Sequence, residues 1–141
     1  MPSAFENLCG PGKPLVPEPP NSAEFEGLRT MGLEKLADAR RTGLALASQF
    51  DLAYNAAHAL CLAALRAQGY RSSNRYIVFQ LLPHTLALGP EVWRVLAKCH
   101  EVRNRGEYEG LLDITQRLVA DLLKAADKVA ERLGALAPPE T

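Results

Sequence analysis

The chain has 141 residues, of which 48% are hydrophobic, enough apolar surface for the core of one domain. Sixteen Lys and Arg residues balance sixteen Asp and Glu residues, which argues against a protein that coats nucleic acid through a uniform positive field. The three cysteines, Cys9, Cys61 and Cys99, are too widely spaced for a disulfide framework or a zinc site. We therefore expect free thiols in a reducing cytoplasm.

Targeting segments are not evident in the sequence. The N-terminus lacks the basic residues and long apolar run of a signal peptide, and no stretch reaches the roughly 20 apolar residues of a membrane span. We expect a cytoplasmic protein without a membrane partner.

The chain begins with a Pro- and Gly-rich arm, residues 1–22, in which Cys9 to Pro20 read CGPGKPLVPEPP. Proline removes backbone donors and fixes extended geometry, so this segment predicts an irregular arm that lies on the domain or on a partner. Residues 23–134 form the predicted helical domain, and residues 135–141 are expected to be a frayed tail.

The first two helices follow from apolar residues that recur every three to four positions. Ser22 is a suitable N-cap for a helix that reaches about Arg41. A second helix is expected from Leu44 to Gln68 and ends at Gly69, in the position of a C-cap glycine. The many alanines of this second helix indicate that its neighbours approach closely, so we place it at the centre.

Three further helices are expected downstream. One begins at Ser72 or Ser73 and runs through Leu82, where Pro83 breaks it. The next opens at residues 89–91, Gly-Pro-Glu, runs to about Asn104 and ends at Gly106. The last spans Gly110 to Leu133. The predicted fold is all-α, an antiparallel four/five-helix up-and-down bundle with an irregular Pro-rich N-terminal arm.

A polar stripe interrupts the apolar second helix. Asp51, Asn55 and His58 are four and then three residues apart, which places them on one helical face. Burying such groups without partners costs roughly 1–3 kcal/mol each, so they must meet water, a ligand or other polar groups. A hydrogen bond of His58 inside the fold is the simpler alternative.

A second polar group lies at the end of the fourth predicted helix. Arg103 follows Cys99 by four residues, so it projects from a face that packs into the core. Its guanidinium is suited to phosphate or carboxylate, and an ion pair with Asp51 or Glu107 is the structural alternative. Asn104 and Tyr108 follow, and we expect a turn at Gly106 to bring Tyr108 back beside Arg103.

Two segments on the second and fourth predicted helices have an order and spacing typical of a known helical family. Residues 53–60 read AYNAAHAL, and residues 99–110 read CHEVRNRGEYEG. Together they resemble the HEPN superfamily of small helical bundles, most closely a branch with an RNxxxY helix end. The similarity covers Leu33 to Leu133 and leaves the arm outside.

The resemblance implies a bundle that forms a homodimer, with the Arg-Asn motifs of both copies along one cleft. Many relatives are metal-independent ribonucleases, and others bind nucleotides or partner a minimal nucleotidyltransferase in toxin–antitoxin pairs. Arg103 and Asn104 match the start of the family motif. Where the ribonuclease pattern has a His, this chain has Tyr108, whose hydroxyl is a poor base at neutral pH, so the resemblance favours binding over cleavage.

The leading hypothesis is a non-catalytic or weakly catalytic domain that binds nucleotide, RNA phosphate or a partner protein. Its expected binding residues are Asp51, Asn55, His58, Arg103, Asn104 and Tyr108. One alternative is a metal-independent endoribonuclease in which Arg103 acts with Tyr108 or His58. Another is a helical adaptor whose polar cluster is structural and whose arm binds the partner. No cofactor or metal ion is expected.

Overall fold

A computed structural model describes residues 3–110 and 113–139, except for the side chains of Tyr108 and Glu109. The described elements are a 3-10 turn η1 (Glu6–Leu8), strands β1 (Val16–Pro17) and β2 (Tyr70–Arg71), and helices α1 (Ser22–Ala39), α2 (Leu46–Ala67), α3 (Arg75–Gln80), α4 (Leu82–Thr85), α5 (Pro90–Glu109) and α6 (Gln116–Gly134). The predicted all-α bundle is confirmed.

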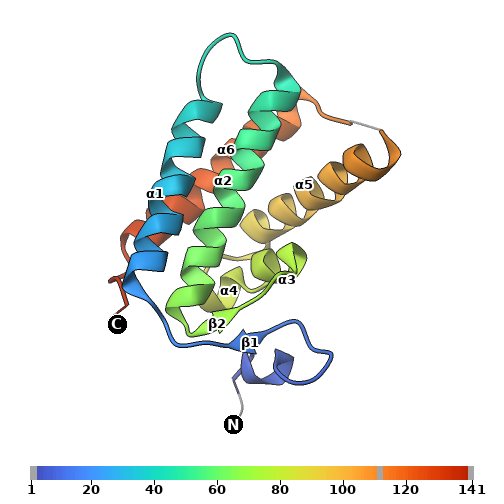
Figure 1. The fold of residues 1–141 in the computed structure, drawn as a ribbon. Coiled ribbons are helices and arrows are strands. Elements are labelled where there is room, and N and C mark those ends of the chain that lie inside the picture. The colour runs from blue at the N-terminus through green and yellow to red at the C-terminus, as the bar shows by residue number, and fades with distance from the viewer. Residues whose placement is uncertain (1–2, 111–112, 140–141) are drawn as a thin grey trace.

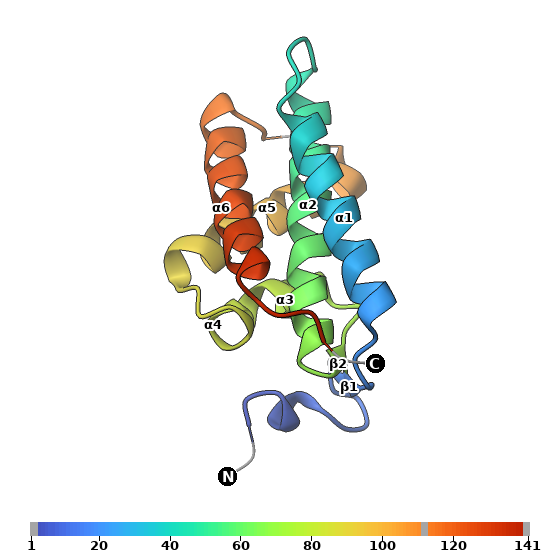
Figure 2. The ribbon, with the colours of Figure 1, turned by 90° about the vertical axis from the view of Figure 1, so that its left-hand side faces the viewer.

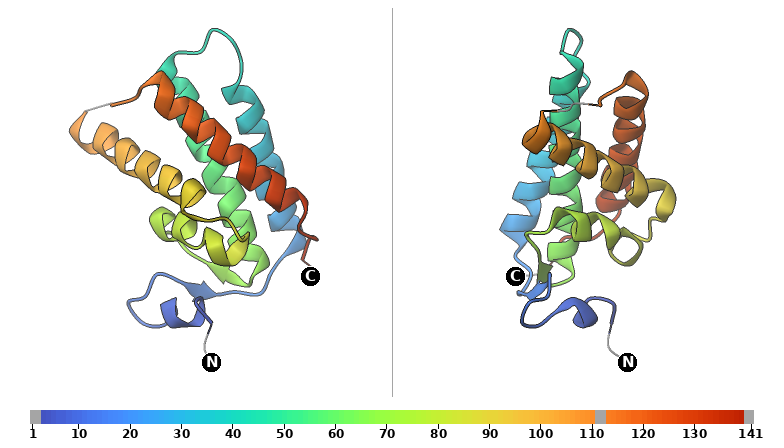
Figure 3. Two further views of the ribbon diagram at one scale, coloured as in Figure 1. Left: turned by 180° about the vertical axis from the view of Figure 1, so that it is seen from behind. Right: turned by 90° about the vertical axis from the view of Figure 1, so that its right-hand side faces the viewer.

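The long helices alternate in direction around α2. Helices α1 and α2 form an antiparallel pair, α6 packs across the back of that pair, and α5 crosses the bundle obliquely (Figures 1 and 2). The short helices α3 and α4 lie below α5 at one end (Figure 3). This arrangement brings α2, α3 and α5 together on one side of the molecule.

Helix α2 is the centre of the core, as its composition predicts. Most of its side chains are buried, many of them alanines that let α1 and α6 approach. Gly32 of α1 marks the tightest approach, because a Cβ there would lie 2.7 Å from Cγ of Leu60 and 3.2 Å from the carbonyl oxygen of Ala56.

The N-terminal arm is more ordered than the sequence indicates. β1 pairs antiparallel with β2, and Leu15 is buried in the core. Phe5 stacks on Tyr70 with ring centroids 5.0 Å apart. The sequence left open whether the arm lies on the domain or on a partner. In the structure it packs on the domain.

Several helices begin or end at other residues than the sequence predicts. Asn21, not Ser22, caps α1, since its side-chain oxygen accepts a hydrogen bond from the Glu24 backbone N–H at 2.9 Å. Helix α1 ends at Ala39, and α2 is two residues shorter at its start than expected. Gly69 follows the end of α2 with φ of +89°, as expected of a C-cap glycine.

The predicted third helix is two short helices, because α3 ends at Gln80 and Pro83 lies in the first turn of α4 rather than after a helix. The prediction that α5 ends near Asn104 was wrong. Gly106 is helical, and the helix ends at Gly110, whose φ of +69° is the left-handed conformation of a C-cap. The predicted start of the last helix includes residues 111–112, which lie outside the described residues; α6 begins at Gln116, after the N-cap Thr115.

Candidate functional site

The polar stripe of α2 faces the side of the bundle where α3 and α5 meet. Asn55 and His58 are half-buried, and they contact Arg75 and Phe79 of α3 respectively. Figure 3 shows the ribbons of α2, α3 and α5 together at this end of the bundle. Asp51 is exposed, and its carbonyl oxygen accepts a hydrogen bond from Nδ2 of Asn55 at 2.9 Å. The stripe therefore contributes an amide and an imidazole to the cluster, while the Asp51 side chain stays in solvent.

Helix α5 contributes a matching polar face. His100, Arg103 and Asn104 are three and four residues apart and half-buried, one turn beyond the buried Leu96 and Cys99. Nδ2 of Asn104 lies 3.2 Å from Nε2 of His100. Arg103 and Asn104 were expected in the site from the sequence, and His100 is an additional member that the structure brings beside them.

Tyr54 joins the two faces from within the core. Its fully buried hydroxyl lies 2.7 Å from Nδ1 of His100. The guanidinium carbons of Arg103 and Arg75 lie 5.3 and 5.5 Å from the centre of the Tyr54 ring, within the range of a cation–π interaction. One buried tyrosine therefore anchors two arginines from two different helices.

Arg75 is the member of the cluster that the sequence did not reveal. It is the first residue of α3, directly after the N-cap Asn74, and its Nη1 donates to Oδ1 of Asn55 at 3.1 Å. No motif marks Arg75, because only the packing of α3 against α2 and α5 places its side chain beside Tyr54.

The two imidazoles of the cluster are held neutral. Burial, together with the positive charges of Arg75 and Arg103 and the neighbouring His100, lowers the pKa of His58 to about 4. Burial and the same two arginines also lower the pKa of His100. Both rings are thus uncharged at neutral pH and available as hydrogen-bond donors and acceptors.

The positive charge of the two arginines is only partly neutralised. Arg103 pairs with Glu107 at 3.4 Å, one of the two ion pairs that the sequence allowed, and the Glu107 side chain is 52% exposed. Within the described part of the chain, Arg75 has no carboxylate partner. The cluster therefore carries a local excess of positive charge on a molecule whose total charge is zero.

Tyr108 remains in α5, five residues beyond Arg103, so the expected turn at Gly106 does not form. Its side chain lies outside the described residues, and its role in the site stays a prediction.

The three cysteines are free thiols, as the sequence predicts. Cys61 and Cys99 are free and buried in the core. Burial raises the pKa of the Cys99 thiol to about 12 and also raises that of Cys61, which disfavours the reactive thiolate. Among the described residues, no group of His, Cys, Asp and Glu is arranged to hold a metal ion.

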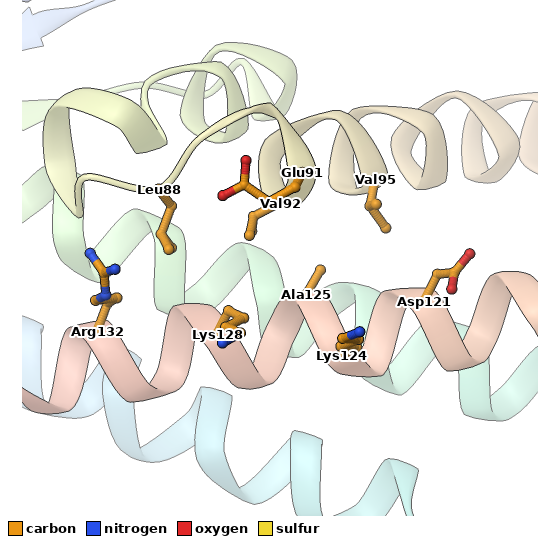
Figure 4. Close-up of a pocket in the computed structure, with 9 residues that line it drawn as sticks. All are labelled: Leu88, Glu91, Val92, Val95, Asp121, Lys124, Ala125, Lys128 and Arg132. Atoms are coloured by element: carbon orange, nitrogen blue, oxygen red, sulfur yellow. The ribbon is translucent and has the colours of Figure 1, made fainter.

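A separate cavity of about 590 Å³ lies between the start of α5 and α6 (Figure 4). Leu88, Val92 and Ala125 form its apolar floor. Its rim carries both signs of charge, from Glu91, Asp121, Lys124, Lys128 and Arg132. This mixed rim selects neither an anion nor a cation, so the arginine-rich cluster is the stronger candidate site.

No helix within residues 3–110 and 113–139 is both long enough and apolar enough to cross a bilayer. No family model, no curated protein and no solved structure matches the chain.

Proposed function

We propose that this domain is a HEPN-like module that binds the phosphate groups of a nucleotide or single-stranded RNA at the cluster of Tyr54, Arg75, His58, His100 and Arg103, without cleaving the ligand. The observation that carries the proposal is the pair of arginines held on one buried tyrosine, of which Arg103 pairs with the exposed Glu107 and Arg75 has no carboxylate partner among the described residues. Two like charges in one cluster repel, and a phosphate placed between them relieves that repulsion.

The chemistry of the cluster suits a phosphate ligand. Guanidinium groups donate paired hydrogen bonds to phosphate oxygens, and Arg75 and Arg103 approach from different helices. Asn104 carries an amide donor beside His100, and the side-chain oxygen of Asn55 accepts from Arg75 and so supports that arginine in the cluster. Because both imidazoles are neutral, the site adds no third and fourth cation. His100 is hydrogen-bonded to Tyr54 and Asn104, which leaves the ring of His58 as the imidazole that recognises a sugar or base edge.

Binding is tested by fluorescence anisotropy with a labelled single-stranded RNA and with competing AMP, in the presence of EDTA. Arg103→Gln and Arg75→Gln should each weaken binding at least tenfold, a loss of about 1.4 kcal/mol. Arg94→Gln is the matched control, because Arg94 lies nine residues before Arg103, about two and a half turns away on the opposite face of α5. Equal affinity of the wild type and both cluster variants would overturn the proposal.

A metal-independent endoribonuclease is the second candidate, and one observation favours it. His58 is unprotonated at pH 7 beside Arg75 and Arg103 and can accept the proton of a ribose 2′-hydroxyl, as a weak base with a pKa of about 4. The 2′-oxygen would then attack the adjacent phosphorus, with an arginine stabilising the phosphate and the 5′-oxygen of the next nucleotide leaving. This enzyme predicts RNA cleavage in the presence of EDTA that is lost in His58→Gln. Intact RNA after prolonged incubation at high protein concentration would eliminate it.

The proposal includes the partners that the resemblance implies, a second copy of the chain and a minimal nucleotidyltransferase. Sedimentation velocity should give twice the monomer mass of 15.4 kDa at micromolar concentration. A monomer at every concentration would reject the shared cleft while leaving a binding site within one chain.

A further inference from the structure

We infer that the N-terminal arm, residues 3–21, positions Arg75: by fixing strand β2, the arm determines where α3 begins and thus where the Arg75 guanidinium lies in the cluster. The functional consequence of this inference rests on the proposed phosphate-binding function. The structural link itself can be measured without a ligand.

The backbone of the arm is fastened to β2. Val16 pairs with Arg71 and Pro17 with Tyr70, and the Glu18 backbone N–H donates to the Gly69 carbonyl oxygen at 2.9 Å. A two-stranded ladder of this length is weak alone, so further contacts must hold it.

Side chains supply that support. Oε2 of Glu18 accepts hydrogen bonds from Nε and Nη2 of Arg71 at 2.9 and 2.8 Å, and Glu24 at the start of α1 accepts from Arg71 as well. Arg66, only 2% exposed, pairs with Glu24 and donates to the carbonyl oxygens of Glu18, Pro19 and Tyr70. Arm, α1, α2 and β2 therefore meet in one network of ion pairs and hydrogen bonds.

The connection from β2 to Arg75 is short and braced. Only three residues separate Arg71 from Arg75. The first, Ser72, is buried and its hydroxyl accepts from the Asn74 backbone N–H at 3.0 Å, while Oδ1 of Asn74 caps α3 by accepting from the Ile77 backbone N–H at 3.2 Å. Because the side chains of Ser72 and Asn74 are both hydrogen-bonded, we expect a displacement of β2 to move the start of α3 as well.

His58 reports the position of Arg75. The charged groups that face it are Arg75 from α3 and Arg103 from α5, with His100 of α5 beside them. Its ring also meets the edge of Phe79 in α3, with centroids 6.1 Å apart. If Arg75 moves away, the repulsion on a protonated His58 weakens and its pKa rises.

The test is an NMR titration of the His58 ring in the full chain, for the wild type, Glu18→Ala, Arg75→Gln and the double variant. We expect Glu18→Ala to raise the pKa of His58 by at least half of the rise caused by Arg75→Gln, and to add nothing in the Arg75→Gln background. Arg71→Gln, which breaks the same ion pair from β2, should reproduce the effect of Glu18→Ala. Lys13→Gln is the control, because the hydrogen bond that Lys13 donates to the Asn7 carbonyl oxygen stays within the arm.

An unchanged pKa of His58 in folded Glu18→Ala and Arg71→Gln, or an equal rise in Lys13→Gln, would overturn the inference. RNA affinity is measured on the same proteins, and we expect it to fall at least threefold in Glu18→Ala. Failure of the wild type to bind RNA overturns the proposed function alone, because the titration needs no ligand. RNA affinity unchanged in Glu18→Ala, together with an unchanged pKa, overturns the positioning role alone.

Discussion

His58 illustrates how packing decides the chemistry of a single side chain. Its position on the polar stripe of α2 follows from the sequence, but its charge state does not. That state depends on Arg75 and Arg103, which reach it from α3 and α5, and on burial by the same helices. A residue that titrates near pH 6.5 in isolation is thereby neutral throughout the physiological range.

The lowered pKa of His58 makes stability depend on pH. The unfolded chain binds a proton near pH 6.5 and the folded chain only near pH 4, so the contribution of neutral His58 is present above pH 6.5 and is lost as the pH falls toward 4. When the pH is lowered from about 7 to about 5, the free energy of unfolding should therefore fall by about 2 kcal/mol less in His58→Gln than in the wild type. Urea denaturation at both pH values measures this difference, and equal losses would contradict the assigned environment.

Glu18 and Glu24 do not obscure that comparison. Hydrogen bonds from Arg71 and Arg66 lower the pKa of Glu18 and Glu24 respectively, so their contribution to stability is lost only as the pH falls below the ordinary carboxyl value of 4.5. At about pH 5 both carboxylates remain ionised in the folded chain.

The buried guanidinium of Arg66 should be needed for folding. Arg66→Met removes one of the two arginines that donate to Glu24 and leaves three backbone carbonyl oxygens without their side-chain donor, and we expect a loss of about 3 kcal/mol. The matched variant is Arg40→Met, which breaks an ion pair with Asp127 whose partners are 42% and 52% exposed and should cost less than about 1 kcal/mol. Similar losses in the two variants, measured by chemical denaturation, would contradict this account of the network.

Helices α1 and α2 pack along their lengths and approach closely at Gly32. Gly32→Ala places a methyl group against Leu60 and should destabilise the fold by about 1–3 kcal/mol through overpacking. Gly27→Ala in the same helix meets nothing within 4 Å and should stabilise the fold by up to about 1 kcal/mol, because alanine restricts the unfolded chain. Thermal unfolding of both variants tests the contrast, and a stabilised Gly32→Ala would show that the two helices do not approach as described.

The periodicity of apolar residues predicts which segments are helical better than it predicts where the helices end. Periodicity identified α1, α2, α5 and α6, since each buries an apolar stripe. It could not choose between Gly106 and Gly110 as the end of α5, because a helix tolerates a glycine at a cost of about 1 kcal/mol and only the backbone conformation distinguishes the two. The pairing of β1 with β2 was missed because two-residue strands leave no periodic signal.

The candidate site was predictable only in part for a related reason. Asn55, His58, Arg103 and Asn104 stand out because they interrupt apolar helical faces. Arg75, His100 and Tyr54 do not. Their roles arise from distances between helices, which no single-sequence pattern contains.

On the scale of the whole molecule, the bundle converts a neutral composition into a local positive site. Sixteen acidic and sixteen basic residues cancel, yet α3 and α5 each direct an arginine onto the same tyrosine of α2. The arm at one end of the bundle fixes the start of α3, so segments more than fifty residues apart in sequence contribute to one cluster.

Phosphate binding at the cluster should be visible in the salt dependence of RNA binding. For single-stranded nucleic acid, each phosphate contact adds about 0.7 to the steepness with which log K falls as log salt concentration rises. Removal of one contact should therefore reduce that slope by about 0.7. We predict that Arg75→Gln and Arg103→Gln each reduce the slope by about that amount, that the double variant reduces it by about twice as much, and that Arg94→Gln leaves it unchanged. A double variant with the slope and affinity of the wild type would contradict phosphate binding at this cluster.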